Sequence, residues 1–88
     1  MDTHRQQSEA DEVREAIGRQ MRSRRAQREM TQADLAQRTG ISAVEVDRLE
    51  RGERDMEIPE AVAIAAVFET TAAEFLQSVQ DSLDDKSL

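Results

Sequence analysis

The chain has 88 residues, a formal net charge of −7 and no cysteine, which excludes disulfides and thiolate metal sites and fits one domain with a modest core. No apolar run approaches the ~18 residues of a membrane-spanning helix, and residues 1–12 lack the pattern of a secretory signal, so we expect a cytoplasmic protein. Strong helix formers dominate and only two residues are aromatic, which predicts an all-α fold.

The first predicted helix runs from Ser8 or Asp11 to Arg28, after a flexible acidic tail of residues 1–10. Its apolar residues recur at helical spacing, at Ala10, Val13, Ile17 and Met21. Four helix starts show a serine or threonine followed three residues later by an acid, which is typical of a capping box. They are Ser8 with Asp11, Thr31 with Asp34, Ser42 with Glu45, and Thr71 with Glu74.

Two short helices are predicted next, over residues 32–39 and 43–51, with Gly40 and Gly52 ending them in the left-handed conformation that glycine adopts at low cost. A fourth helix begins near Ile58, with Pro59 in its first turn and apolar residues through Phe68. A fifth helix follows Thr71. We expect one domain over residues 11–80 and a frayed acidic tail over residues 81–88.

Charge is unevenly distributed along the chain. Residues 1–12 sum to −3 and residues 55–88 to −7, whereas residues 13–54 sum to +3 and contain ten of the eleven arginines. Arginine donates two parallel hydrogen bonds and therefore suits phosphate and guanine recognition. The central block is thus the candidate nucleic-acid surface, although a solvated helix face explains residues 13–30 equally well.

Residues 31–52 carry the most specific motif. The run Thr31-Gln-Ala-Asp-Leu-Ala-Gln-Arg-Thr-Gly-Ile-Ser, followed by Val46 and Leu49-Glu50-Arg51-Gly52, resembles the Xre/Cro family of helix-turn-helix regulators. The similarity extends from about Ile17 to Leu76. It implies a compact five-helix repressor-like bundle in which the second and third helices form the helix-turn-helix and the third reads the DNA major groove.

The resemblance also assigns roles to residues. It implies that Gln32 contacts a phosphate and braces the third helix, and that Arg25 and Glu50 form an ion pair between the first and third helices. The expected DNA-binding residues are Gln32, Ser42, Ala43, Val44, Asp47, Arg48, Arg51 and Arg54.

Side-chain chemistry agrees with these roles. Arg48 can bond the O6 and N7 of a guanine together, whereas Ala43 and Val44 offer only apolar contact to a thymine methyl group. Arg51 and Arg54 can hold phosphates, which fixes the register without reading sequence.

The sequence also departs from the family pattern. Arg24 replaces a usual leucine and Glu29 a usual glycine, which predicts a thinner core under the first helix and an altered turn. The acidic residues of the third helix and of the loop after it oppose DNA binding. They are Glu45, which a capping box explains, and Asp47, Glu53, Asp55 and Glu57. For Asp47 the alternative is that its carboxylate accepts a hydrogen bond from the N4 amino group of a cytosine.

Two functions remain open. The first is a sequence-specific DNA-binding regulator, most simply a repressor. The second is a helix-turn-helix module, such as an antitoxin or an accessory subunit, that binds a protein partner through its acidic C-terminal half and binds DNA weakly or not at all. A contiguous arginine face along the third helix favours DNA, and a face interrupted by acids favours the protein partner. The single His4 has no partners at metal spacing and no apolar pocket is expected, so we predict no enzyme, metal or cofactor.

One recognition helix reads too few base pairs to find a site alone, so we expect a homodimer on double-stranded DNA. Val79 and Leu83 continue the apolar stripe of Phe75 beyond the expected core. These three residues are the predicted dimer interface, exposed in a monomer and buried against a partner. A frayed tail with two exposed apolar residues is the simpler alternative.

Overall fold

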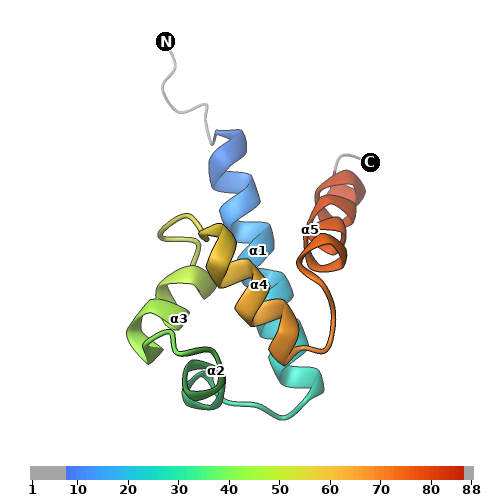
Figure 1. Ribbon diagram of the computed structural model, residues 1–88. Helices are drawn as coiled ribbons and strands as arrows, with labels where there is room; N and C mark the ends of the chain where they lie inside the picture. Colours follow the sequence, from blue (N-terminus) through green and yellow to red (C-terminus); the bar gives the residue numbers. More distant parts are fainter. Residues whose placement is uncertain (1–7, 87–88) are drawn as a thin grey trace.

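Five α-helices joined by short loops make up the computed structural model, which describes residues 8–86 (Figure 1). They are α1 (Glu9–Gln27), α2 (Gln32–Thr39), α3 (Ala43–Glu50), α4 (Ile58–Val67) and α5 (Ala72–Lys86). The described residues contain no strand, so the predicted all-α fold is confirmed. Most of the predicted N-terminal tail lies outside the described residues, although Glu9 and Ala10 already belong to α1.

The helix starts form through local hydrogen bonds. The hydroxyls of Ser8, Thr31, Ser42 and Thr71 each accept a bond from the backbone N–H three residues later, as predicted. At Thr31 the box is reciprocal, because the Asp34 carboxylate accepts from the Thr31 backbone N–H at 3.0 Å. These contacts satisfy N–H groups that the first turn of a helix leaves without partners.

The core lies where all five helices meet. Its largest fully buried side chains are Phe68, Phe75, Met21, Leu35, Leu49, Ile64 and Val46. In α1 only the second half of the predicted stripe is buried, since Ala10 and Val13 are exposed. Helix α1 packs against α3 and α5, and α2 against α3 and α4. Figure 1 shows α2 and α3 at the end of the molecule opposite the N-terminus of α1 and the C-terminus of α5.

The prediction that Phe75, Val79 and Leu83 are exposed in a monomer, as a dimer interface, is wrong. Phe75 is fully buried, Val79 is only 3% exposed, and Leu83 packs partly buried against the same core. The reason is that α5 lies along α1, which covers this stripe within a single chain. These side chains therefore belong to the intramolecular core and are not free to meet a partner.

Helix α5 also extends further than predicted. It continues to Lys86, whereas the sequence suggested a frayed tail from residue 81. Contacts with α1 and within the helix accompany the extension: Arg19 donates to the Ser82 hydroxyl at 3.3 Å, and Gln80 donates to Asp84 at 3.0 Å.

Helix α4 is apolar on both its faces. Its inner face buries Ala61, Ile64 and Ala65, while Val62 is 54% exposed. Within the described part of the chain no single helix is long and apolar enough to cross a membrane; α4 and α5 reach that length only as a pair bent by 96°.

Candidate nucleic-acid interface

The α2–turn–α3 unit presents one face of α3 to solvent. Gly40 ends α2 in the left-handed conformation, with φ of +81°, and the chain then turns through Ile41 into α3. Val46, Leu49 and Glu50 lie on the buried face of α3. The opposite face carries the residues expected to meet DNA: Ser42, Ala43, Val44, Arg48 and Arg51 are exposed, and Asp47 is half-buried.

Arg25 and Glu50 form the ion pair that the resemblance implies. Arg25 Nε lies 2.6 Å from Glu50 Oε2, and Nη2 lies 2.9 Å from Oε1, so the contact is bidentate. Arg25 also donates to the Met30 backbone oxygen at 2.8 Å, and its hydrogen bonds to Glu50 raise its pKa. The Glu50 side chain is almost fully buried, and the pair therefore ties α1 to the last turn of α3.

Gln32 joins the start of α2 to the same site. Its Nε2 donates to Glu50 Oε1 at 2.9 Å and to Asp47 Oδ1 at 3.1 Å. An amide nitrogen has two hydrogens, so both donors are occupied by carboxylates of α3. The bracing contact expected of Gln32 is thus present. The Asp34 N–H bonds the Thr31 hydroxyl, so within the described chain the backbone N–H groups of Gln32 and Ala33 are the ones left as donors for a phosphate.

Gly18 permits α1 and α3 to approach closely. A Cβ added there would overlap the backbone oxygen of Glu50, which also accepts a hydrogen bond from Arg22. The end of α3 is therefore held against α1 by a glycine contact, a backbone acceptor and the Arg25 pair.

Arg48 and Arg51 lie on the exposed face, each beside an acid of the same helix. Arg48 Nη1 is 3.3 Å from Glu45 Oε2, and Arg51 Nε is 2.9 Å from Asp47 Oδ2. Both guanidinium groups are at least 44% exposed, so such pairs contribute little stability and exchange readily.

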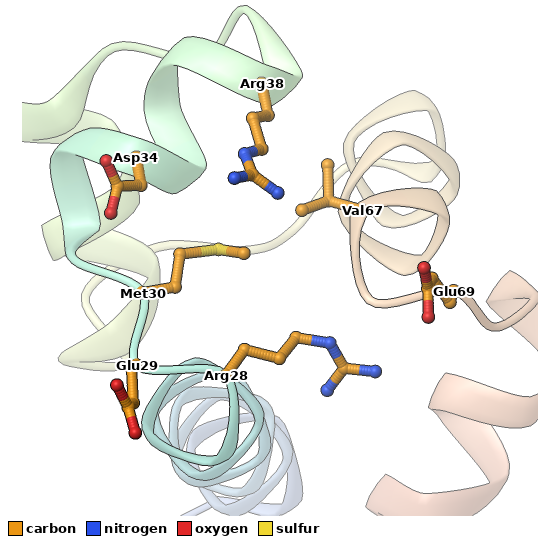
Figure 2. A pocket seen from close by; sticks show the side chains of 7 residues that line it. All are labelled: Arg28, Glu29, Met30, Asp34, Arg38, Val67 and Glu69. Atoms are coloured by element: carbon orange, nitrogen blue, oxygen red, sulfur yellow. The ribbon is translucent and has the colours of Figure 1, made fainter.

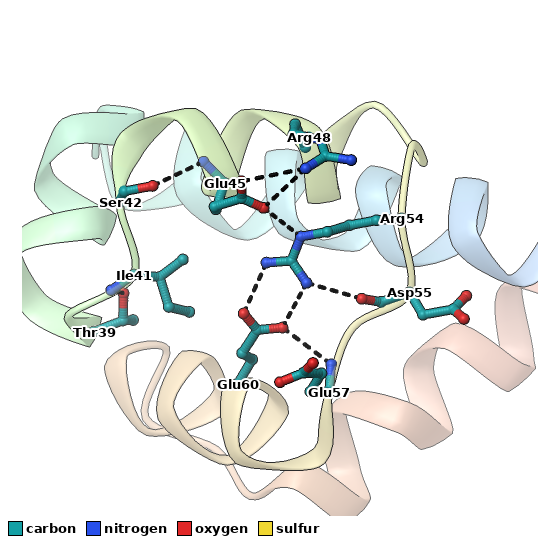
Figure 3. Close-up of polar contacts among 9 residues, drawn as sticks. All are labelled: Thr39, Ile41, Ser42, Glu45, Arg48, Arg54, Asp55, Glu57 and Glu60. Carbon is teal, nitrogen blue, oxygen red and sulfur yellow. Dashed lines mark hydrogen bonds and ion pairs between the residues drawn. The ribbon is translucent and has the colours of Figure 1, made fainter.

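Arg54 is placed differently from the expectation. Its Nε bonds Glu45 Oε1 at 2.6 Å, and its Nη1 and Nη2 bond the two carboxylate oxygens of Glu60 at 2.9 and 2.7 Å (Figure 3). These bonds raise the pKa of Arg54 and lower that of Glu60. Glu60 was not among the predicted site residues, and its only signal in the sequence is its position three residues after Glu57, at the start of a helix.

The structure also accounts for three other acidic residues of this region, Asp55, Glu45 and Glu29. The Asp55 carboxylate pairs with Arg14 of α1 at 2.7 Å. Glu45 does not act as the expected capping acid, because its carboxylate bonds Arg54 and Arg48 instead. Glu29 adopts φ of +52°, the left-handed conformation that explains why a glycine is usual there.

Most arginines of α1 are used within the fold. Arg24 lies 5.6 Å from the Phe75 ring centre and donates to Ser78 at 3.0 Å, so it covers the core where a leucine was expected. Arg28 covers the Phe68 ring in the same way, at 5.5 Å, and donates to the Phe68 backbone oxygen at 2.6 Å. The basic block of the sequence therefore does not form one contiguous arginine face.

A shallow groove of about 270 Å³ lies between the end of α1, α2 and the end of α4 (Figure 2). Its floor includes Met30 and Val67, and its walls mix Arg28 and Arg38 with three acids, Glu29, Asp34 and Glu69. Because both signs of charge line it, the groove does not extend the candidate DNA surface.

Comparisons with known proteins agree with this geometry. The clp gene regulator ClgR from Corynebacterium glutamicum matches in two crystal structures: one with 25% identity and a TM-score of 0.78 over 85% of this chain and 80% of that one, the other with 27% identity and a TM-score of 0.72 over 80% and 91%.

An HTH_3 family transcriptional regulator from Vibrio cholerae matches with 26% identity and a TM-score of 0.70, over 77% of this chain but only 38% of its own. No curated protein matches. A family model described as a helix-turn-helix domain matches residues 16–76, most of the described chain. The protein therefore belongs to the helix-turn-helix domain family, in agreement with its resemblance to the Xre/Cro regulators.

Proposed function

We propose that the protein is a sequence-specific DNA-binding repressor of transcription that acts in the cytoplasm and reads the major groove with α3. The observation that carries this proposal is that α3 is fixed along one face by Glu50 and its partners Arg25 and Gln32, while the opposite face is exposed. A rigid, exposed helix of this size fits the major groove of B-DNA. The transcriptional regulators among its structural relatives support the same function, which is binding and not catalysis.

The proposed contacts follow from exposure and chemistry. Arg48 reads a guanine, Ala43 and Val44 meet a thymine methyl group, and Ser42 and Asp47 complete the base-facing surface. Arg51 leaves Asp47 to bind a phosphate, and the N-terminus of α2 at Gln32 binds another through its backbone N–H groups.

Selection of bound sites from random duplex DNA tests this proposal. We expect enrichment of a two-fold symmetric sequence with half-sites about 34 Å apart. The variant Arg48→Ala should weaken binding to that sequence by about 1–3 kcal/mol and relax the preference at one base pair per half-site. An Arg48→Ala variant with unchanged affinity and preference would show that α3 is not the reader.

A homodimer is the second part of the proposal, and α4 supplies a surface for it. Ile58, Val62 and Ala66 recur every four residues on the exposed face of α4, and Ile58 is 71% exposed. This stripe carries no charge, although the whole chain is strongly acidic. A second copy can approach most easily where like charges are absent, so we propose that two α4 helices pack against each other about a two-fold axis.

One observation favours the alternative, a module that binds a protein. Each arginine expected on the DNA surface lies beside a carboxylate: Arg48 beside Glu45, Arg51 beside Asp47, and Arg54 between Glu45 and Glu60. These carboxylates neutralise the arginines, so the surface offers DNA little net positive charge, whereas the acidic C-terminal half suits a basic protein partner. Failure of the selection to enrich any sequence, from a folded protein, would favour this function.

A further inference from the structure

Arg54 occupies a position where a phosphate contact is expected, but its side chain is only 19% exposed. Nε bonds Glu45, Nη2 bonds Glu60, and Nη1 bonds both Glu60 and the Asp55 backbone oxygen, at 2.9 Å each (Figure 3). All three nitrogens of the guanidinium therefore have partners inside the protein. A phosphate could reach Arg54 only after these charge-assisted bonds were broken.

The partners of Arg54 connect the reading helix to the rest of the fold. Glu45 lies in the first turn of α3, whereas Glu60 lies in the first turn of α4 and accepts from the Glu57 backbone N–H at 3.0 Å. Glu45 also lies 3.3 Å from Arg48, the proposed base reader. A continuous series of polar contacts thus runs from α4 through Arg54 and Glu45 to Arg48, as Figure 3 shows.

The two ends of α3 are held separately. Its last turn is fixed through Glu50, and Val46 and Leu49 anchor its middle in the core. Near the first turn, which presents Ala43 and Val44, the contact between Glu45 and Arg54 is an ion pair that joins α3 to α4. The angle of this turn in a groove decides which base edges its side chains can reach.

We infer that Arg54 is a positioning residue, which orients the first turn of α3 through Glu45 and thereby determines base preference. This inference rests on the proposed function and makes Glu60 part of the same device. A phosphate contact would change the salt-dependent affinity for every duplex alike, whereas a positioning residue changes the sequence preference.

The variant Glu60→Gln gives a sharp test, because two explanations predict opposite results. If Glu60 acts only as a negative charge near DNA, its removal should tighten binding to every duplex and leave the preference unchanged. If Glu60 holds Arg54, its removal should loosen α3. We then expect the ratio of affinities for the selected site and a scrambled duplex to fall about tenfold.

Glu53→Gln is the matched control. It removes the same charge from the loop that carries Arg54, and the Glu53 side chain is exposed and bonds no partner within the described residues. We expect it to keep the wild-type affinity ratio. A Glu60→Gln variant that behaves like Glu53→Gln, with the ratio unchanged, would overturn the inference.

Arg54→Lys provides a second variant and a second readout. Lysine keeps the charge that a phosphate needs but cannot form the fork that joins Glu45 to Glu60. We expect a reduced affinity ratio with an unchanged slope of log affinity against log salt concentration. For Arg54→Gln, a slope smaller by about 0.9 would instead identify Arg54 as a phosphate contact and overturn the inference.

Circular dichroism of each variant, measured before the titrations, tests whether the helices are intact. If wild-type protein selects no sequence, the proposed function itself fails. If wild-type protein is selective and Glu60→Gln is equally selective, only the positioning role of Arg54 fails, so the two failures are distinguishable.

Discussion

Glu50 connects the last turn of α3 to both α1 and α2. A carboxylate that is 3% exposed must be paired, because burial of a lone charge is costly. Arg25 supplies two bonds and Gln32 a third. These contacts therefore join α1, α2 and α3 at one point. Because a buried ion pair adds little net stability, we expect its main effect to be on how these helices are arranged.

The first prediction concerns this pair. Arg25→Met should lower the free energy of unfolding by roughly 3–5 kcal/mol, because it leaves the Glu50 charge buried without its partner. The double variant Arg25→Met with Glu50→Leu should lose less than Arg25→Met alone. Urea unfolding followed by circular dichroism measures both. A double variant less stable than Arg25→Met would contradict the assignment of a buried, mutually compensating pair.

The second prediction concerns acid stability. The hydrogen bonds from Arg54 hold the pKa of Glu60 below its ordinary value of 4.5. A carboxyl group whose pKa is lower in the folded state stabilises the fold above its unfolded pKa, and that contribution is lost as the pH falls through the folded pKa. Stability should therefore decrease below about pH 4.5.

Glu60→Gln isolates this contribution. Urea unfolding of wild type and variant should show the larger loss for wild type as the pH falls below about 4.5, so that the difference between them narrows. The pKa of Asp34 is also lowered, by the Thr31 backbone hydrogen bond, and this acid remains in the variant. Parallel curves for wild type and Glu60→Gln would show that the Arg54 bond does not stabilise the folded state.

Among the elements, the apolar stripe that is exposed lies on α4, and not on α5 as predicted. The stripe of α5 was expected to be free, but it lies against α1, whereas α4 exposes Ile58 and Val62. Periodicity identifies an apolar face without saying whether the same chain or another covers it.

The third prediction therefore places self-association on α4. Val62→Asp should leave the fold intact and convert a dimer to a monomer, because two buried charges would face each other across the two-fold axis. Val13→Asp, at an exposed apolar site on α1, is the control and should remain dimeric. Sedimentation equilibrium at tens of micromolar distinguishes these states. A Val62→Asp protein that sediments like wild type would exclude α4 as the interface.

Val79→Asp distinguishes the two helices further. Because Val79 lies in the core, its replacement by aspartate should destabilise the protein by about 3 kcal/mol or more and should not produce a folded monomer. Thermal unfolding of Val79→Asp beside Val62→Asp measures the contrast. Equal melting temperatures would contradict the assignment of α5 to the core.

At the scale of the whole molecule, a cluster of acidic residues lies at the end opposite α3. Figure 1 shows α3 at one end and the C-terminus of α5, a helix that carries Asp81, Asp84 and Asp85, at the other. Charges at such separations act on DNA only when the Debye length is long, at low salt. The acidic end should therefore moderate non-specific binding without affecting base preference.

The fourth prediction follows from this arrangement. Replacing Asp81, Asp84 and Asp85 with asparagine should raise the affinity for random duplex DNA roughly threefold at low salt, and not at high salt. Deletion of residues 81–88 is a poorer test, because it also removes Leu83 from the core. Fluorescence anisotropy at several salt concentrations measures the effect, and an unchanged low-salt affinity would contradict it.

The sequence by itself determined the features that depend on near neighbours. Ser8, Thr31, Ser42 and Thr71 bond N–H groups three residues away, and Gly40 adopts the left-handed conformation at its own position. Such interactions need no distant partner, so their residue types and spacing suffice to locate the starts of α1, α2, α3 and α5. The helix-turn-helix motif followed from the same local pattern.

Only the tertiary structure decided how the arginines and the apolar stripes are used. Arg24 meets Phe75, Arg54 meets Glu45 and Glu60, and Val79 is buried where α5 lies against α1. Some of these contacts join residues more than fifty positions apart, and the sequence does not state which surfaces will meet. A guanidinium can bind a carboxylate, an aromatic ring or a phosphate by its own chemistry, so packing decides which arginines cover the core and which lie on the exposed face of α3.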